Sequence, residues 1–442
     1  MRTSNYPNLK AVLYLSGGFF LQFVAVTSAI SVVSTTLREC GFKNLGFYSL
    51  AVNYLVFGLC SLVAPPIIRK LKPILSMTLG SVCYDIWLIT LSLPAILLKS
   101  EKLKLYFSYN QVVAIVLIAS IIMGFGCALI WVGQGKYLSD CSKYKIERKG
   151  VYSSIFWFTF YISSILSSIL AALILGSYPQ EYLYFICFII SVLSKVILIS
   201  LPKIQTEEQD QQLFQNNQPE QVDLDILKLI TDKQMIVTYG VFLTSALSNG
   251  FRMSGLFSFL TLTQTNETIQ NQFKYASYAQ ALFGIGQAAG SALFGYLSVK
   301  LKSNFKLTQG AIIVHIISYS SMIWCNELYK FGFLSFCACF FLGIQDSYLQ
   351  NQTQVIMGAE FKQTTEAFAI FRLFNSVGVT FILLIISNLT NSERFRQFII
   401  GSLLFSIFSQ IIMIKLFKFR QQQGDIAQDN KNQAIESLIQ KC

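Results

Sequence analysis

The chain has 442 residues, of which 53% are hydrophobic and only 13% are charged. An ordinary soluble domain carries about 25% charged residues because its surface must face water, so this composition argues against a soluble globular protein and favours an integral membrane protein. The formal net charge of +12 does not indicate a nucleic-acid partner, because the basic residues occupy short loops between apolar runs, as membrane topology requires.

Six long apolar runs follow one another in the first half of the chain. A membrane-spanning helix needs about 20 mainly apolar residues, and helices are favoured over strands because these runs are long and lack alternation. The first run is longer than the core of a cleavable signal peptide, about 7–15 residues, so we expect it to be retained. The predicted spans are 9–34, 45–66, 74–98, 109–135, 151–176 and 181–201.

An acidic, glutamine-rich stretch at residues 203–232 interrupts the apolar pattern, and its polarity predicts a solvated linker. Six further runs follow it. These predicted spans are 234–261, 275–299, 307–326, 331–357, 365–388 and 395–417. The expected organisation is a six-helix bundle at residues 1–202, the linker at 203–232, a second bundle at 233–418 and a polar tail at 419–442.

Lysine and arginine are unevenly distributed over the loops. If the N-terminus is cytoplasmic, the inside segments hold more than twice as many of these residues as the outside loops. The positive-inside rule therefore predicts that both termini and the linker are cytoplasmic, in a plasma membrane or endomembrane. Glycosylation sequons at Asn266 and Asn388 fall in loops predicted to lie outside, whereas the sequon at Asn351 falls within a span and is attributed to chance.

A short repeat relates the two halves. Arg69-Lys70-Leu71-Lys72 follows the second span, and Lys300-Leu301-Lys302 follows the eighth. Two six-span halves joined by a cytoplasmic linker are typical of the major facilitator superfamily. We therefore expect an all-α integral membrane protein with twelve transmembrane helices in two pseudo-symmetric bundles.

Ionisable residues inside the spans are the main candidates for function. Each costs about 2.5–3.5 kcal/mol at a helix centre and so usually faces a partner or water. Asp346 and Arg372 lie at nearly equal depth on adjacent spans, which predicts an ion pair that either holds helices together or lines and gates a cavity. In the major facilitator plan, spans one, four, seven and ten line that cavity. The cavity and charge candidates are Asp346, Arg372, Arg252, Asp85, Asn249 and Gln350.

Three other polar residues fall within the predicted spans. Lys195 lies near the cytoplasmic end of its span, so we expect its side chain to extend toward the interface. Gln22 adds polarity to the first span and is expected at the cavity. His315, the only histidine, is interpreted as a hydrogen-bonded interior residue rather than a proton relay.

No motif indicates an enzyme. Gly133-Gln134-Gly135-Lys136 lacks the full phosphate-binding loop pattern and the strand that should precede it. The sequence offers no hydrolytic triad, paired-carboxylate site or metal-ligand cluster, and most cysteines lie in apolar runs, where they behave as small hydrophobes. We expect no cofactor and no metal site.

Several stretches resemble the uncoordinated-ninety-three family, whose members are major-facilitator-like and named for a potassium-channel regulator. The first is residues 44–54 (NLGFYSLAVNY), and others are 342–347 (LGIQDS), 367–371 (AFAIF) and 375–378 (NSVG). The most specific stretch is a motif in the fourth span. Its residues are Trp131, Gly133, Gln134, Gly135, Lys136 and Tyr137.

The resemblance implies a non-enzymatic regulator or trafficking partner of another membrane protein, such as a potassium channel, within the lipid bilayer. The intramembrane charges favour the alternative, a secondary transporter of a small solute or ion by alternating access. Two features depart from the patterns of these families: Gln345 stands where the uncoordinated-ninety-three family tends to have glycine, and the loop after the second span lacks the acidic residue of the transporter loop motif.

Overall fold

The computed structural model describes residues 8–99, 106–142, 149–202, 204, 228–301, 303–361 and 364–419. The regular secondary structure in these ranges is helical, as the sequence predicts. Most of the predicted linker and the tail from residue 420 lie outside the described residues.

Each span predicted in the first half coincides with a helix. The boundaries extend past the apolar runs by a few residues, because polar helix ends can project beyond the hydrocarbon. The helices are α1 (Leu9–Glu39), α2 (Leu45–Leu71), α3 (Pro73–Lys99), α5 (Tyr109–Ser142), α6 (Lys149–Leu175) and α7 (Gln180–Ile199).

The second half is also helical, but its first predicted span is not a uniform α-helix. A π-helical turn, η2 (Phe251–Gly255), joins α10 (Lys233–Gly250) to α11 (Leu256–Leu262). Nothing in the hydrophobic pattern indicates this turn. The remaining helices are α12 (Ile269–Leu301), α13 (Asn304–Leu328), α14 (Phe333–Ala359), α15 (Thr364–Ile386) and α16 (Ser392–Leu416).

Polar side chains mark where several of these helices begin. The Asp232 carboxylate accepts hydrogen bonds from the backbone N–H groups of Gln234 and Met235 at the start of α10. Ser303 and Asn391 cap α13 and α16 in the same way. Such caps satisfy backbone donors that the first helical turn leaves unpaired.

Among the described residues, nine helices are long and apolar enough to cross a membrane. The predicted spans that do not meet this criterion fall on α10–α11, α12 and α14. These helices carry buried polar side chains, including Asp346 and Gln287. Large apolar side chains such as Phe381 and Leu404, which are 62% and 63% exposed, cover the outside of the molecule, as expected of a lipid-facing surface.

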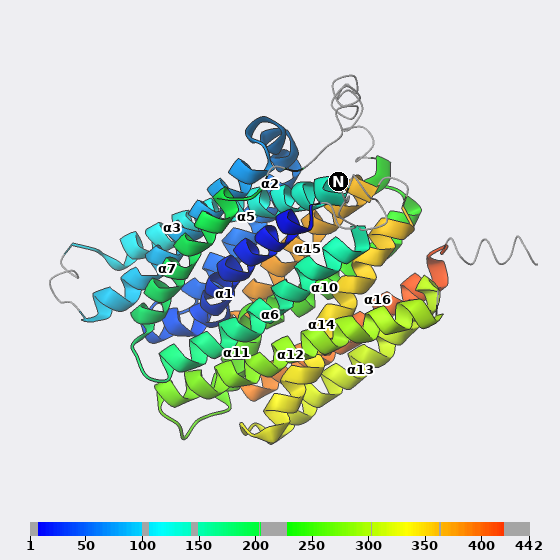
Figure 1. Ribbon diagram of the computed structural model, residues 1–442. Coiled ribbons are helices and arrows are strands. Elements are labelled where there is room, and N and C mark those ends of the chain that lie inside the picture. Colours follow the sequence, from blue (N-terminus) through cyan, green and yellow to red (C-terminus); the bar gives the residue numbers. More distant parts are fainter. Residues whose placement is uncertain are drawn as a thin grey trace, which may run out of the picture.

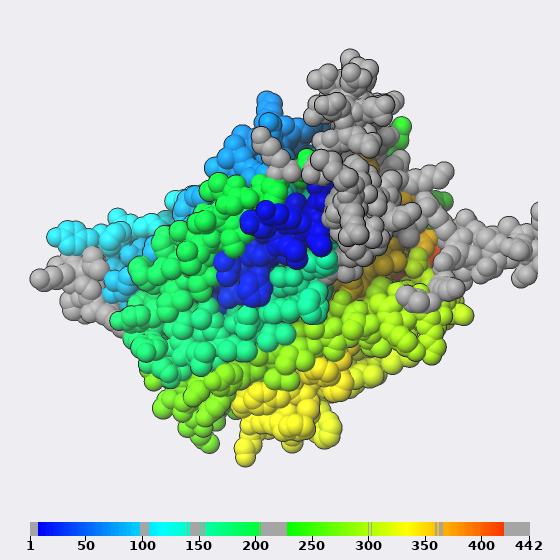
Figure 2. Space-filling view, in the orientation of Figure 1, coloured from blue at the N-terminus to red at the C-terminus, as the bar shows by residue number. Residues whose placement is uncertain are grey.

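The helices form two groups that correspond to the two halves of the chain. Figure 1 shows α3 and α7 toward one side and α12, α13 and α16 toward the other, with α10 and α15 between them. The halves meet where α6 packs on α12 and where α2 packs on α15. In Figure 2 the seam is visible as blue-to-green atoms against lime and yellow ones.

Small residues allow the helices to approach closely. A Cβ atom at Gly284 of α12 would lie 2.8 Å from Ile165 Cγ1 of α6, across the seam. Gly286 and Gly290 of α12 lie against the backbone of α14. Small residues at such contacts stabilise membrane bundles because backbones can pack directly on one another.

Candidate functional site

The Asp346 carboxylate is buried between three helices of the second half. Asp346 belongs to α14 and is 3% exposed. Its Oδ1 atom accepts a hydrogen bond of 2.9 Å from Ser248 Oγ of α10, and its Oδ2 atom accepts one of 2.8 Å from Gln287 Nε2 of α12. Two neutral donors therefore hold the carboxylate in place.

The predicted ion pair between Asp346 and Arg372 is absent. Both residues are described, yet no ion pair joins them, and no hydrogen bond or ion pair links Arg372 to any described residue. The prediction rested on the equal depth of the two residues in the membrane. An ion pair also requires that each helix be rotated about its axis so that the two side chains face each other. Asp346 faces α10 and α12, where both of its oxygens accept hydrogen bonds, whereas Arg372 is half-buried on α15.

A chain of amides and hydroxyls continues from Asp346 toward α15. Gln350 Nε2 and Asn375 Nδ2 both donate to Ser245 Oγ, at 3.1 and 2.9 Å. Asn249 Nδ2 lies 3.5 Å from Asn375 Oδ1. The structure thus brings the predicted residues Asn249 and Gln350 together through Ser245 and Asn375, which were not among the candidates selected from the sequence.

Arg252 lies on the π-helical turn η2. Its Nη2 atom is 3.5 Å from Asn249 Oδ1, and its buried Nε atom has no hydrogen-bond partner among the described residues. Arg252 lines a cavity of about 20 Å³ at the seam between the halves. The other lining residues come from α1, α6, η2, α11 and α12, and they are Thr27, Ile30, Ser31, Ser164, Ser168, Met253, Leu256, Gln280 and Phe283.

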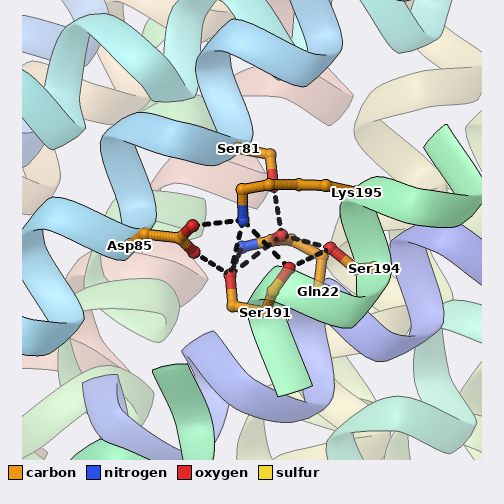
Figure 3. Close-up of polar contacts among 6 residues, drawn as sticks. All are labelled: Gln22, Ser81, Asp85, Ser191, Ser194 and Lys195. Carbon is orange, nitrogen blue, oxygen red and sulfur yellow. Dashed lines mark hydrogen bonds and ion pairs between the residues drawn. The ribbon is translucent and has the colours of Figure 1, made fainter. Parts of the chain in front are cut away.

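Asp85 belongs to a separate polar cluster inside the first half, shown in Figure 3. Asp85 Oδ2 of α3 lies 2.5 Å from Lys195 Nζ of α7, and both side chains are 11% exposed. The Lys195 ammonium also donates to the Ser191 carbonyl oxygen at 2.9 Å. This ion pair was not predicted.

Gln22 of α1 is the centre of the same cluster. Its Oε1 atom accepts hydrogen bonds from Ser81 Oγ at 2.5 Å and from Ser194 Oγ at 2.6 Å. Its Nε2 atom donates to Ser191 Oγ at 2.9 Å, and Ser191 Oγ donates to Asp85 Oδ1 at 2.5 Å. Gln22 is fully buried by these contacts, so it does not line the cavity as expected.

Lys195 does not extend toward the cytoplasmic interface, so that expectation is wrong. A helical side chain tilts toward the N-terminus of its helix, and for α7 this direction leads away from the predicted cytoplasmic end. The Asp85 carboxylate lies on that side and fixes the ammonium there. The Lys195 ammonium therefore pairs with a buried carboxylate instead of reaching the polar surface of the membrane.

The family motif forms the end of α5 and has structural contacts. Trp131 lies against Phe23 of α1 and Phe160 of α6, with ring centroids 5.0 and 5.5 Å apart. Tyr137 is buried, and its hydroxyl donates to the Pro202 carbonyl oxygen at 2.7 Å.

The other motif residues divide between packing and surface positions. Gly133 lies against Met77 of α3 and Gln134 is buried, whereas Gly135 has open space beside it. Lys136 forms an exposed ion pair with Asp140 at 2.6 Å. The packed residues of the motif, Trp131, Gly133 and Tyr137, therefore hold α5 against its neighbours.

The remaining candidates have simple outcomes. Asn266 and Asn388 are exposed at helix ends, where a glycan could be attached. His315 is 1% exposed, and neither ring nitrogen has a hydrogen-bond partner among the described residues, so the expected hydrogen-bonded histidine is not found. Within the described ranges, no group of three or more His, Cys, Asp or Glu residues is arranged to hold a metal ion.

Solved structures with a similar fold are transporters. The chain aligns with a nucleoside transporter, NupG, at a TM-score of 0.62 and 16% identity, covering 93% of this chain and 100% of that one. It aligns with a mutant of a peptide transporter, POT, at a TM-score of 0.66 and 11% identity, covering 92% and 95%. Identities this low establish only a fold of the major facilitator type.

Sequence relatives lead to one family. "Protein unc-93 homolog A" from Bos taurus is 24% identical over 421 residues, covering 84% of this chain and 86% of the relative. "UNC93-like protein MFSD11" from Xenopus laevis is 23% identical over 416 residues, covering 84% and 88%. The family profile described as "Ion channel regulatory protein UNC-93" matches residues 42–414. The chain is therefore a member of the UNC-93 family, as the sequence resemblance predicted, with a fold shared by major facilitator transporters.

Proposed function

We propose that this protein is a secondary transporter that binds a small polar solute between its two halves and moves it by alternating access. The observation that carries this proposal is the cavity at Arg252, because residues of both halves line it. Thr27 and Ser164 belong to the first half, and Arg252 and Gln280 belong to the second. A solute bound there would be released when the halves separate on one side of the membrane.

Contacts between the two halves support this proposal, and two of them join α1 to the continuous helix formed by α10, η2 and α11, here called the α10–η2–α11 rod. The hydroxyls of Ser34 and Ser254 are in contact, and Thr35 Oγ1 lies 3.3 Å from Ser258 Oγ. Thr380 Oγ1 of α15 donates to the Ala51 carbonyl oxygen of α2 at 3.2 Å. In the predicted orientation these contacts close the outer end, and neutral hydroxyl pairs are weak enough to open during a transport cycle.

Reconstitution of the full-length protein into proteoliposomes tests transport directly. Uptake of radiolabelled succinate, phosphate, uridine and a dipeptide would be measured with and without a proton or potassium gradient. We expect uptake of at least one solute, and we expect Asp346→Asn to abolish it by removing the buried carboxylate that joins α14 to Ser248 of α10 and Gln287 of α12. Glu327→Gln removes an exposed carboxylate and serves as the control. Absence of uptake for every solute would contradict the proposal.

The second candidate is a non-enzymatic regulator or trafficking partner of another membrane protein, such as a potassium channel. Membership of the family described as ion channel regulatory supports it. Stoichiometric co-purification of a channel from native membranes, together with an altered potassium current on co-expression and no solute uptake, would favour this candidate over transport.

We also propose that the chain crosses the membrane twelve times, with two six-helix units, a cytoplasmic linker and both termini in the cytoplasm. The correspondence of every predicted span with a helix supports this topology. Epitope tags at both termini should be labelled only after the membrane is permeabilised. Labelling of one terminus in intact cells or sealed vesicles would contradict the even number of spans.

A further inference from the structure

We infer that the cavity at Arg252 is a binding site for a small oxyanion, meaning a carboxylate or phosphate group. This inference rests on the proposed function and specifies its substrate class. It begins with the bonding of the Arg252 guanidinium. A guanidinium has five N–H donors and is always charged, but the hydrogen bond found for Arg252 is a long one, 3.5 Å, to Asn249 of the preceding helical turn.

Arg252 has no protein counter-ion in the part of the chain that the structure describes. Its Nε–H is buried without a partner, and no ion pair links it to a described carboxylate. Asp346 is the nearby acid, but Ser248 and Gln287 already occupy its two oxygens. The Arg252 side chain is only partly buried, but its Nε–H is removed from water without a partner. That desolvation costs free energy, and a bound anion would offset it.

Neutral donors line the same cavity. Gln280 is 6% exposed, and its amide forms no hydrogen bond with any described residue. The hydroxyls of Thr27 and Ser164 likewise have no side-chain partner within the described ranges. An arginine flanked by unpaired amide and hydroxyl donors is suited to an oxyanion, because each anion oxygen accepts several hydrogen bonds. The positive charge of Arg252 disfavours a cation in the same cavity.

Arg372 adds a second positive charge on α15, a helix that packs on α2 at the seam. Asn249 Nδ2 and Asn375 Oδ1 are 3.5 Å apart. Arg252 follows Asn249 by three residues, and Arg372 precedes Asn375 by three residues. Because α10 and α15 run in the same direction in the predicted topology, the two guanidiniums are offset by about six residues, or ~9 Å, along the membrane normal. A second cation at this depth attracts an anion toward Arg252 and disfavours a cationic solute.

The size of the cavity limits what occupies it in this conformation. A volume of about 20 Å³ holds one group of the size of a water molecule. At most one oxygen of a carboxylate or phosphate group fits there while α1 and η2 remain in contact. The rest of the solute enters when the halves separate.

Binding measurements on the full-length protein in nanodiscs test the inference without requiring transport. The probes are radiolabelled succinate and radiolabelled phosphate at constant ionic strength, measured by equilibrium dialysis. We expect saturable binding of at least one probe, a loss of affinity of at least ten-fold in Arg252→Gln, and partial retention in Arg252→Lys. Arg396→Gln removes an exposed arginine at a helix end and should leave binding unchanged.

The outcomes separate this inference from the proposal of transport. If neither probe binds, or if Arg252→Gln binds as wild type does, the oxyanion site is overturned. Melting temperatures establish that the variants are folded, and Arg252→Lys keeps the test informative should the glutamine variant misfold. Anion binding without uptake would support the site and contradict transport. Uptake of uridine that is indifferent to Arg252→Gln would support transport and contradict the oxyanion site.

Discussion

Asp85 and Lys195 form an ion pair whose charges are balanced almost entirely by protein groups. Each side chain is 11% exposed, and Ser191 contacts both through its hydroxyl and its carbonyl oxygen. Gln22 then links Ser191 to Ser81 of α3. The pair therefore connects α1, α3 and α7, and it lies apart from the seam where a solute would pass.

We predict that Asp85→Asn destabilises the protein far more than a double replacement of the pair. The single variant leaves the Lys195 ammonium buried without a counter-ion, which costs about 3–5 kcal/mol. Asp85→Asn combined with Lys195→Met removes both charges and should regain most of that loss. Thermal unfolding in detergent would compare the two variants with wild type. A double variant no more stable than the single one would show that the charge balance is not what matters.

The residues of this cluster could be selected from the sequence, although their contacts could not. Ser191, Ser194 and Lys195 are spaced to share one face of a helix, as are Ser81 and Asp85. The apolar content of the surrounding sequence predicts that these residues lie in a membrane span, and their spacing predicts that they share one face of the helix. Which neighbouring helix that face meets depends on rotations that the sequence alone does not reveal, so Asp346 was assigned to Arg372 rather than to Ser248 and Gln287.

At the scale of the elements, glycines allow the backbones of α12 and α14 to approach each other directly. A Cβ atom at Gly286 would collide with the Phe340 backbone, and one at Gly343 would collide with the Phe283 carbonyl oxygen. This contact brings Gln287 within hydrogen-bonding distance of Asp346. The crossing of the two helices therefore sets the geometry of the buried carboxylate.

We predict that Gly286→Ala is destabilising whereas Gly295→Ala, on the same helix, is not. The first substitution forces the backbones of α12 and α14 apart and should cost about 1–3 kcal/mol. No atom lies within 4 Å of a Cβ atom at Gly295, so alanine there should be neutral or stabilising because of its better helix propensity. Melting temperatures of both variants in one detergent would decide. Equal effects would mean that the close approach is not essential.

The π-helical turn is the element that sequence reasoning missed. Hydrophobic periodicity identifies a helix but does not register one extra residue in a turn, and residues 251–255 are ordinary for a membrane helix. Such turns occur often at functional sites. Here the turn carries Arg252 and Ser254, and Ser254 and the following Ser258 contact α1.

On the scale of the whole molecule, both halves contain a close helix contact made by a glycine, with a polar or thiol side chain three residues further along the same helix. Gly124 of α5 lies against the Asn53 carbonyl oxygen of α2, and Cys127 Sγ lies 3.4 Å from Asn53 Oδ1. Gly343 and Asp346 of α14 repeat this spacing against α12. Cys127 and Asp346 therefore hold equivalent places, which explains why the repeat is faint in the sequence: its structural positions are kept while the side chains at the site diverge.

The closure of α1 against the α10–η2–α11 rod leads to the last prediction. Because the hydroxyls of Ser34 and Ser254 touch, the double variant Ser34→Cys/Ser254→Cys should form a disulfide under mild oxidation. With a protease site inserted within residues 205–227, the cleaved halves should then migrate as one band without reductant and as two with it. Uptake should fall at least ten-fold on oxidation and recover on reduction, since the outer ends can no longer separate.

Two controls define what this result means. Ser16→Cys/Ser254→Cys uses the same helices but moves one cysteine by 18 residues, about 27 Å along α1, and should not cross-link. The wild-type protein, whose described cysteines are free, should not link its halves under the same oxidation. Failure of the first pair to cross-link would contradict the contact itself. A cross-linked protein with unchanged uptake would instead show that any solute passes without separation of α1 from the rod, and alternating access between the two halves would have to be abandoned.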